Sequence, residues 1–136
     1  VQLHVSSPFL LTKELLTDMI SAKNGKIIVI SSIWGLVGAS TEVLYSTVKG
    51  ALNTFVKALA KEVAPSGISV NGIAPGAIET QMLDHLTEEE KAMLCDEIPM
   101  GRFGKPIEVA DLAVFLASDS ASYINGQIIS INGAWH

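Results

Sequence analysis

Apolar residues along the chain follow two different periods, which predict alternating helices and strands. In residues 5–22 and 43–64 the apolar positions recur every three or four residues, as is typical of helices with one buried face. Short runs rich in Ile and Val at 26–32, 68–74 and 127–131 predict strands instead. The first run lacks polar alternation, which favours a strand buried on both faces.

Turn and capping residues predict where these elements end. The Asn-Gly pair at 24–25 is a helix stop, and the Pro-Ser-Gly sequence at 65–67 breaks the second helix. Thr87, followed by three Glu residues, is a strong helix start within an acidic helical stretch over 81–98, and Pro106 opens a further amphipathic helix. The resulting order of helices and strands predicts an α/β fold with a parallel sheet and right-handed crossovers.

Composition narrows the class of protein. The chain has 136 residues, 49% of them apolar, so we expect one modest core in a single domain. A net charge of -5 without runs of Lys or Arg argues against nucleic acid or an anionic membrane as a partner. Cys95 is the only cysteine, which favours a reducing compartment, and no apolar run approaches the ~20 residues of a membrane span. We therefore expect a soluble cytoplasmic protein.

Tyr45 and Lys49 are the first candidates for chemistry. They stand four positions apart near the start of the second helix, so both side chains project from one face. A Lys charge ~5 Å from a phenolic oxygen favours the phenolate by roughly 3 kcal/mol, which suits proton transfer near neutral pH. Ser32 closes the run 26–32, at the strand end where open α/β sheets bind ligands. The alternative makes Tyr45 a half-buried aromatic and Lys49 a solvated helix residue.

No glycine-rich phosphate-binding motif follows a predicted strand. Gly35 and Gly38 lie in the loop after Ser32, and Gly101 and Gly104 lie in a polar connection. The half of a dinucleotide-binding fold that cradles pyrophosphate is therefore expected upstream, as roughly a hundred further residues at ~30 per βα unit. We interpret residues 1–136 as the carboxyl-terminal part of a doubly wound, Rossmann-like fold.

The order of these residues resembles a known signature. Ser32, then Tyr45 and Lys49 with three residues between them, then Pro-Gly at 75–76 and Thr80 resemble the short-chain dehydrogenase/reductase family. The resemblance covers nearly the whole chain. It implies hydride transfer between a nicotinamide cofactor and a carbonyl or alcohol, with Ser32, Tyr45 and Lys49 as catalytic residues.

The resemblance also implies where the cofactor binds. A proline fixes the backbone after the second predicted strand, and the following glycine allows a flat ligand to come close. A plain strand-to-helix turn with an N-capping Thr is the alternative. NADPH is expected from the likeness to reductases, with NADH possible, because the discriminating residues belong to the missing half. The expected cofactor-binding residues are Tyr45, Lys49, Pro75, Gly76, Ile78 and Thr80.

Three further residues have two interpretations each. His4 stands where the family commonly has an Asn that holds a water of the proton relay; an imidazole could substitute, or His4 is an ordinary helix-entry residue. Trp34, in the loop 33–42, faces the substrate or packs inside. Met82 belongs to a mobile substrate lid over 81–98, or to a core-packed helix pair. No metal site is predicted.

Two groups within the family match different parts of the chain. Residues 75–133 are most similar to 3-oxoacyl-acyl-carrier-protein reductases. Residues 1–5, 31–35 and 42–46 and the Trp-His pair at 135–136 resemble bacterial elongation factor P 5-aminopentanone reductases. The likeness implies a ketone carried on acyl carrier protein or on elongation factor P, and a homo-oligomer. A sugar or alcohol dehydrogenase of this family, or a non-catalytic assembly module, remains an alternative.

Overall fold

Three parallel strands form the centre of the structure, a computed structural model that describes every residue of the chain. They are β1 (Gly25–Ile30), β2 (Ile68–Pro75) and β3 (Ile128–Ile131), in the spatial order β1-β2-β3. In the parallel register, Ile28 lies opposite Asn71 and Ile73 opposite Ile129. Each connection between strands contains a helix, as parallel pairing requires. The predicted α/β class with a parallel sheet is confirmed.

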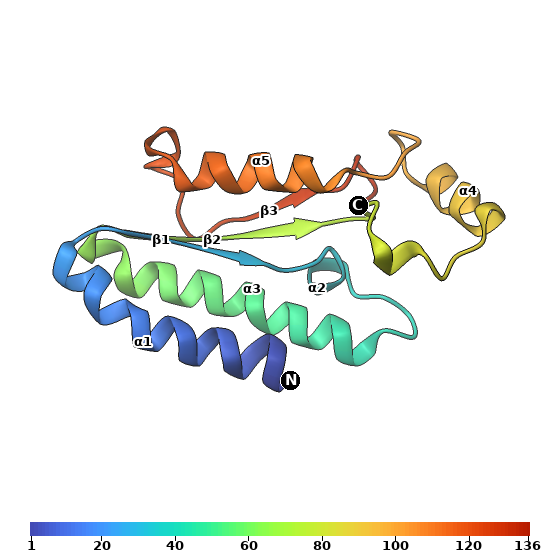
Figure 1. The fold of residues 1–136 in the computed structure, drawn as a ribbon. Coiled ribbons are helices and arrows are strands. Elements are labelled where there is room, and N and C mark those ends of the chain that lie inside the picture. Colours follow the sequence, from blue (N-terminus) through green and yellow to red (C-terminus); the bar gives the residue numbers. More distant parts are fainter.

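Helices cover both faces of this sheet. The helices α1 (Ser7–Ala22) and α3 (Val43–Val63) lie on one face, and α5 (Pro106–Ala117) lies on the other (Figure 1). Helix α4 (Glu88–Glu97) lies beyond the carboxyl ends of the strands (Figure 1). None of the helices combines the length and the apolar character that crossing a membrane requires. The shorter helical turns are η1 (Gln2–Ser6), α2 (Trp34–Val37), η2 (Ala64–Ser66), η3 (Gln81–Leu83) and η4 (Asp119–Ala121).

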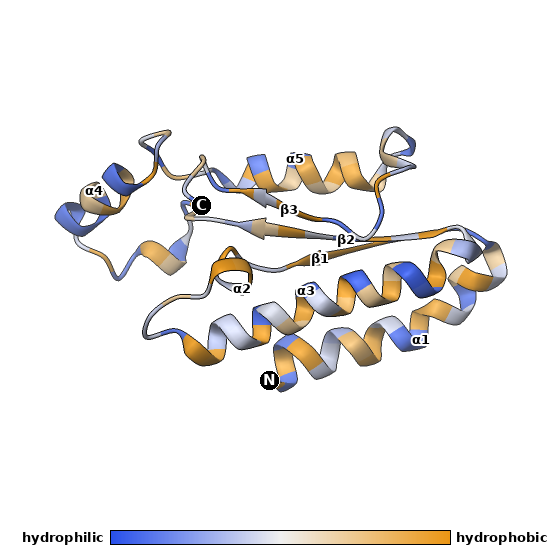
Figure 2. Ribbon diagram, turned by 180° about the vertical axis from the view of Figure 1, so that it is seen from behind, coloured by the Kyte–Doolittle hydropathy of each residue, from blue (hydrophilic) through white to orange (hydrophobic).

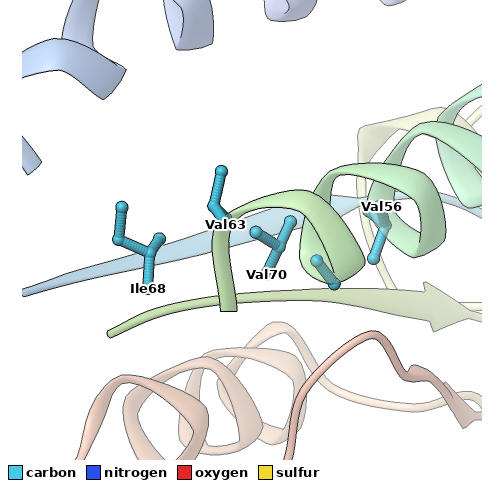
Figure 3. Close-up of a cluster of buried hydrophobic side chains, with 5 residues drawn as sticks. Val56, Val63, Ile68 and Val70 are labelled. Carbon is cyan, nitrogen blue, oxygen red and sulfur yellow. The ribbon is translucent and has the colours of Figure 1, made fainter. Parts of the chain in front are cut away.

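The central strand β2 carries most of the core because it is covered on both faces. Ile68 and Val70 point to one face and pack against Val56 and Val63 of α3 (Figure 3), in a cluster that also holds Ala60. Burying each of these larger side chains stabilises the fold by about 1.5–3 kcal/mol. This cluster holds α3, the helix with the predicted catalytic pair, firmly on the sheet.

The opposite face of β2 packs against α5. Ile73 is fully buried there with Leu116 of α5 and Ala121 of η4. Figure 2 shows α5 coloured largely as hydrophobic, in agreement with this contact. Because successive side chains of a strand point to opposite faces, the run 68–74 needs apolar residues at both kinds of position. The strand accordingly carries apolar residues at both kinds of position, although Ser69, Asn71 and Gly72 interrupt the run.

The first strand packs on both faces, as its unbroken apolar run predicted, but its burial is incomplete: Ile27 and Val29 pack on the cluster below α3, and Ile28 packs on the cluster that holds Leu116 of α5. Every residue of β1 is only partly buried, and Ile30 is 48% exposed. The reason is its place in the sheet: β1 is an edge strand in this chain, with β2 on one side and no strand on the other. The strand is also shorter than the predicted run 26–32 at its carboxyl end: Ile30 is its last residue, and Ser31 and Ser32 follow it.

The first helix ends differently from the prediction. The residue in the left-handed conformation is Lys23, with φ of 50°, and not Gly25. The Lys23 N–H donates to the carbonyl oxygens of Ile20 and Met19, which closes the helix. Gly25 starts β1 instead, where an added Cβ would lie 2.8 Å from the Met19 sulfur. Its small size serves packing between α1 and β1.

The acidic stretch 81–98 is helical in two pieces rather than throughout. The turn η3 comes first, and α4 begins after Thr87, as predicted. Thr87 Oγ1 accepts from the Glu90 N–H at 3.1 Å, and Glu90 Oε2 accepts from the Thr87 N–H at 2.7 Å. This reciprocal pair is a capping box, which stabilises the helix start.

Candidate active site

The segment after β1 remains attached to β2 although the strand has ended. The Ser31 N–H donates to the Ile73 carbonyl at 2.7 Å, and the Ile33 N–H donates to the Pro75 carbonyl at 3.0 Å. These bonds hold Ser32 at the carboxyl end of the sheet, as the sequence predicted. Open α/β sheets bind their ligands at this end.

The Ser32 hydroxyl accepts one hydrogen bond but donates none within the chain. The side chain is buried, and its Oγ accepts from the Trp34 N–H at 3.2 Å. The Ser32 O–H has no acceptor within the chain. A buried hydroxyl with a free proton is suited to donate a hydrogen bond to a ligand oxygen.

Tyr45 and Lys49 come together on one face of α3, as the four-residue spacing predicted. The Lys49 ammonium lies 5.6 Å from the centroid of the Tyr45 ring. Lys49 is 8% exposed, and its Nζ makes one long contact, of 3.5 Å, to the Ile30 carbonyl oxygen. No carboxylate pairs with Lys49. Burial lowers the pKa of Lys49 from its usual 10.5, because an ammonium loses hydration there.

Three residues that the sequence reading missed position this pair. Ser31 Oγ donates to the Lys49 carbonyl oxygen at 3.2 Å and thus ties α3 to the end of β1. Gly35 lies against the Lys49 backbone, where a larger residue would not fit. Ser46 Oγ accepts from the Ala39 N–H at 3.1 Å and anchors the loop beside the helix start. All three lie in the segments 31–35 and 42–46 that carry the family resemblance, but no local pattern indicated their positioning roles.

His4 and Lys49 line the same groove, although they lie far apart in sequence. The groove has a volume of about 400 Å³ and runs between α1, α3 and the free edge of β1. His4 is half-buried in η1, and its imidazole makes no hydrogen bond within the chain. The other lining residues are Pro8, Leu11, Thr12, Leu15, Met19, the β1 residues 26–30 and Leu52.

The Pro-Gly pair follows the predicted strand, and the structure supplies a packing reason for the glycine. Pro75 is the last residue of β2, and the Gly76 N–H donates to the Ile131 carbonyl at 2.9 Å. An added Cβ at Gly76 would lie 2.8 Å from Asn132 Cβ. The absence of a side chain at Gly76 therefore lets the segment after β3 pack closely here.

The remaining predicted contacts lie along the next segment. Ile78 forms an isolated parallel bridge with Gly104. Thr80 is exposed and precedes η3 without a capping side-chain hydrogen bond, so the alternative N-cap role is not observed. Met82 is 71% exposed on η3 and lines neither the His4 groove nor the pocket beside Trp34. The structure thus does not bring Met82 together with the other site residues.

Trp34 both packs and faces a cavity. Its ring lies 5.2 Å from that of Trp135, measured between centroids and at 67°, and 5.8 Å from that of His136. These three rings form a wall of a pocket of about 540 Å³, here called the aromatic pocket. Its other lining residues are Gly38, Ala39, Ser40, Glu42 and Glu97. The sequence reading missed Trp135 and His136 as site residues.

Known proteins match the chain over its whole length. A family model described as enoyl-(acyl carrier protein) reductase matches residues 1–136. The uncharacterized oxidoreductase YmfI of Bacillus subtilis is 59% identical over 100% of this chain and 56% of its own length. The 3-oxoacyl-[acyl-carrier-protein] reductase FabG of Aquifex aeolicus is 46% identical over 98% of this chain and 54% of its own length. The chain therefore spans about half the length of the curated relatives it matches.

A solved structure agrees in fold. The crystal structure of a protein from Beutenbergia cavernae, described as an NAD(P)-dependent gluconate 5-dehydrogenase with bound NADP, has a TM-score of 0.92 to this chain. The two are 34% identical, and the match covers 97% of this chain and 54% of that one. With Ser32, Tyr45 and Lys49 gathered at the carboxyl end of a parallel sheet, these matches show that the chain belongs to the short-chain dehydrogenase/reductase family.

Proposed function

We propose that the protein containing this chain is an oxidoreductase that reduces a ketone with NADPH. The observation that carries the proposal is the buried Ser32 hydroxyl, whose proton has no acceptor in the chain, at the sheet end that also holds the Tyr45 and Lys49 pair. The relatives named FabG are 3-oxoacyl-[acyl-carrier-protein] reductases, which supports a ketone as the substrate.

The chain's own residues provide binding and proton transfer. The Ser32 O–H donates to the ketone oxygen and stabilises the negative charge that develops on it. Tyr45 gives its hydroxyl proton to that oxygen as the carbonyl carbon is reduced, and takes it back in the reverse reaction. Holding both donors on rigid elements keeps the carbonyl in line for reaction. The nicotinamide cofactor, when bound, supplies the hydride.

Lys49 fits a role at the cofactor. Its buried ammonium has three donors but makes only one long contact, to the Ile30 carbonyl oxygen, and no ion pair. The free donors match the hydroxyl groups of a ribose. Its charge near the Tyr45 ring also favours negative charge on the phenol while the proton is away. Ile78 and Thr80 follow β2 and would meet the carboxamide and phosphate side of the cofactor.

After Tyr45 has given its hydroxyl proton to the substrate, His4 would help to supply a new proton to Tyr45. The groove of about 400 Å³ that joins His4 to Lys49 has room for water molecules between them. A neutral imidazole donates one hydrogen bond and accepts another, so it passes protons along such a chain. His4 would thus take the place of the Asn in the family's commoner relay.

For the substrate, we propose a ketone carried on a protein. FabG of Escherichia coli, 39% identical over 100% of this chain, supports acyl carrier protein. The segments around His4, Trp34 and Tyr45 and the Trp-His pair support elongation factor P bearing 5-aminopentanone. Oxidation of a sugar acid is the second candidate, favoured by the fold match to the protein described as a gluconate 5-dehydrogenase.

We also propose that the protein forms a homo-oligomer through α1 and α3. Apolar side chains of α1 are largely exposed: Phe9 by 54%, Leu10 by 56% and Leu11 by 62%. Figure 2 shows hydrophobic stretches along α1. A second copy would remove them from water. Analytical ultracentrifugation of the full-length protein should show a dimer or tetramer, and a monomer at micromolar concentration contradicts this part.

NADPH oxidation tests the activity. The full-length protein and the 136-residue chain would each be given an acetoacetyl thioester of acyl carrier protein and elongation factor P carrying 5-aminopentanone. NADP⁺ reduction with gluconate tests the second candidate. We expect turnover of a ketone by the full-length protein, and the preferred substrate identifies the carrier. Absence of all three activities would overturn the proposal and favour a non-catalytic assembly role.

A further inference from the structure

We infer that the ion pair between Arg102 and Glu108 is a positioning pair for the nicotinamide end of the cofactor. It acts through Gly104, whose backbone is hydrogen-bonded to the segment 77–79 that follows β2. The inference rests on the proposed function, because it takes a nicotinamide cofactor to bind beside this segment. Neither charged side chain is expected to touch the cofactor itself.

Residues 77–79 are hydrogen-bonded to Gly104 and to no other residue. The Gly104 N–H donates to the Ala77 carbonyl oxygen at 2.9 Å, and the Gly104 carbonyl oxygen accepts from the Glu79 N–H at 2.8 Å. These two are the only hydrogen bonds that residues 77–79 make within the chain. A cavity of about 100 Å³ lies beside Ala77 and Gly104, so close packing does not hold the segment on that side. The position of the segment therefore depends on the position of Gly104.

The backbone of Ile78 is left unpaired by this arrangement. Both hydrogen bonds of the bridge come from the residues on either side of Ile78, so its own N–H and carbonyl oxygen have no partner within the chain. Ile78 is nevertheless half-buried. A primary carboxamide carries an acceptor and two donors, so it can pair with a free N–H and a free carbonyl oxygen of one residue. The position of Ile78 thus decides how the carboxamide of a nicotinamide is held.

Arg102 and Glu108 hold the loop on both sides of Gly104. The Arg102 guanidinium donates to both oxygens of the Glu108 carboxylate, at 2.9 and 2.7 Å. It also donates to the Phe103 carbonyl oxygen at 2.9 Å, and Glu108 accepts from the Lys105 N–H at 2.7 Å. The residues directly before and after Gly104 are thus fixed. Because Glu108 lies in the first turn of α5, the loop is tied to a helix that packs on the sheet.

The ion pair can be removed without unfolding the protein. Both side chains are exposed, and exposed ion pairs contribute little to folding stability. A bidentate pair between Arg and a carboxylate does, however, fix the geometry of the groups that carry it. Hydrogen bonding to Arg102 lowers the pKa of Glu108 to about 2, so the pair is intact at neutral pH. Its loss should therefore change the position of the loop and not the fold.

Binding of two nucleotides to the full-length protein tests this inference. One is NADPH, and the other is 2′-phospho-ADP-ribose, which lacks the nicotinamide but keeps the ribose and phosphate groups. The ratio of their dissociation constants reports the contribution of the nicotinamide, and calorimetric titration measures both constants without turnover. We expect Arg102→Gln to weaken NADPH binding about fivefold or more and to leave the binding of 2′-phospho-ADP-ribose unchanged. An unchanged ratio in Arg102→Gln would overturn the inference.

Lys105→Gln is the matched control for charge. Lys105 is an exposed cation of the same loop that belongs to no ion pair, so this variant loses the same charge as Arg102→Gln. The Lys105 N–H, which donates to Glu108, is kept. We expect both nucleotides to bind as they do to the unmodified protein. An equal loss of NADPH affinity in the two variants would show that attraction of the anionic nucleotide, and not positioning, is the cause.

Gly104→Ala tests the next contact without changing the ion pair. An added Cβ at Gly104 would lie 2.6 Å from Ile78 Cδ1, so the Ile78 side chain must move. We expect the same selective loss of NADPH affinity, about fivefold or more, with 2′-phospho-ADP-ribose again unaffected. Normal NADPH binding by Gly104→Ala contradicts the inference, because the position of Ile78 would then not matter to the nicotinamide.

These binding measurements separate the inference from the proposed activity. If NADPH affinity depends on Arg102 but no ketone is reduced, the inference is supported and only the proposed ketone reduction fails. If a ketone is reduced and Arg102→Gln binds NADPH normally, the proposed reduction stands and the inference is rejected. Equal binding of NADPH and 2′-phospho-ADP-ribose by the unmodified protein also rejects it, since no nicotinamide contact is then left to position.

Discussion

Gly35 lies so close to Lys49 that no side chain fits between them. An added Cβ at Gly35 would be 2.6 Å from the Lys49 carbonyl carbon and 2.8 Å from Lys49 Cβ. Real Cβ atoms do not approach other atoms so closely, and backbone on both sides leaves little room to yield. This contact limits how closely α2 approaches α3. Because Ser32 lies two residues before α2, we expect the contact also to fix the position of Ser32 relative to Tyr45 and Lys49.

We therefore predict that Gly35→Ala impairs turnover. The added methyl group pushes α2 from α3 and displaces Ser32 relative to Tyr45, which should lower kcat about tenfold to a hundredfold. Gly50→Ala is the matched control, because its Cβ would meet the Gly35 carbonyl oxygen at an ordinary 3.5 Å. Steady-state kinetics on both variants checks this. Equal activity of the two would show that the close contact does not set the site.

Tyr45→Phe should remove the proton donor while leaving the ring in place. We predict a fall in kcat of about 10³-fold, with NADPH affinity kept, because general acid catalysis contributes 10²–10⁴-fold. Tyr123→Phe serves as the control, since Tyr123 is the other tyrosine and is fully exposed. Near-normal turnover of Tyr45→Phe would remove Tyr45 from the mechanism.

Lys49→Met should make the protein more stable and inactive. Burial lowers the pKa of Lys49 in the folded state, so the unfolded chain holds its proton more tightly and the charged Lys costs stability. The gain from Met should be full below the folded-state pKa and vanish as the pH rises towards 10.5. Urea unfolding of both proteins at several pH values measures this. If the stability advantage of Lys49→Met increased with pH, the result would contradict this prediction.

Two buried asparagines should respond oppositely to substitution by leucine. Both amide atoms of Asn53 are buried without a hydrogen-bond partner, so Asn53→Leu should raise the free energy of unfolding by about 1–2 kcal/mol. Asn71 donates to the Ile124 carbonyl at 2.9 Å and accepts from the Gln127 N–H at 3.0 Å. Asn71→Leu should lower the free energy of unfolding by about 2–3 kcal/mol. Urea unfolding compares them, and a loss of stability in Asn53→Leu contradicts the first expectation.

The ion pair with Arg102 should keep the exposed Glu108 carboxylate ionised to low pH, because it lowers the pKa of that carboxyl. Both guanidinium nitrogens donate to the carboxylate, at 2.9 and 2.7 Å, and lower the pKa of Glu108 to about 2. Stability from this depressed pKa is present above the usual value near 4.5 and is lost as the pH falls towards 2. Carboxyl NMR titration should show Arg102→Gln raising the pKa of Glu108, and an unchanged pKa would assign the shift to the Lys105 N–H instead.

Local patterns predicted the elements that depend on local causes. The capping box at Thr87, the break at 65–67 and the spacing of Tyr45 and Lys49 each involve residues within one turn of one another. In β2, apolar residues at both alternating positions, such as Val70 and Ile73, likewise indicate burial on both faces. For these features, the amino-acid sequence alone was enough to predict element type, the placement of Tyr45 and Lys49 on one helix face and the parallel α/β class.

Only the tertiary structure decided the features that depend on contacts between distant segments. The exposure of β1 follows from its place at the sheet edge, which no property of its residues shows. The aromatic pocket joins Trp34 to Trp135, a hundred residues apart, through the packing of the segment after β3 against Gly76. The order of Ser32, Tyr45 and Lys49 in the sequence was enough to predict which side chains carry the chemistry. The tertiary structure decided which residues surround these side chains, because the order of the strands in the sheet sets which loops meet at its carboxyl end.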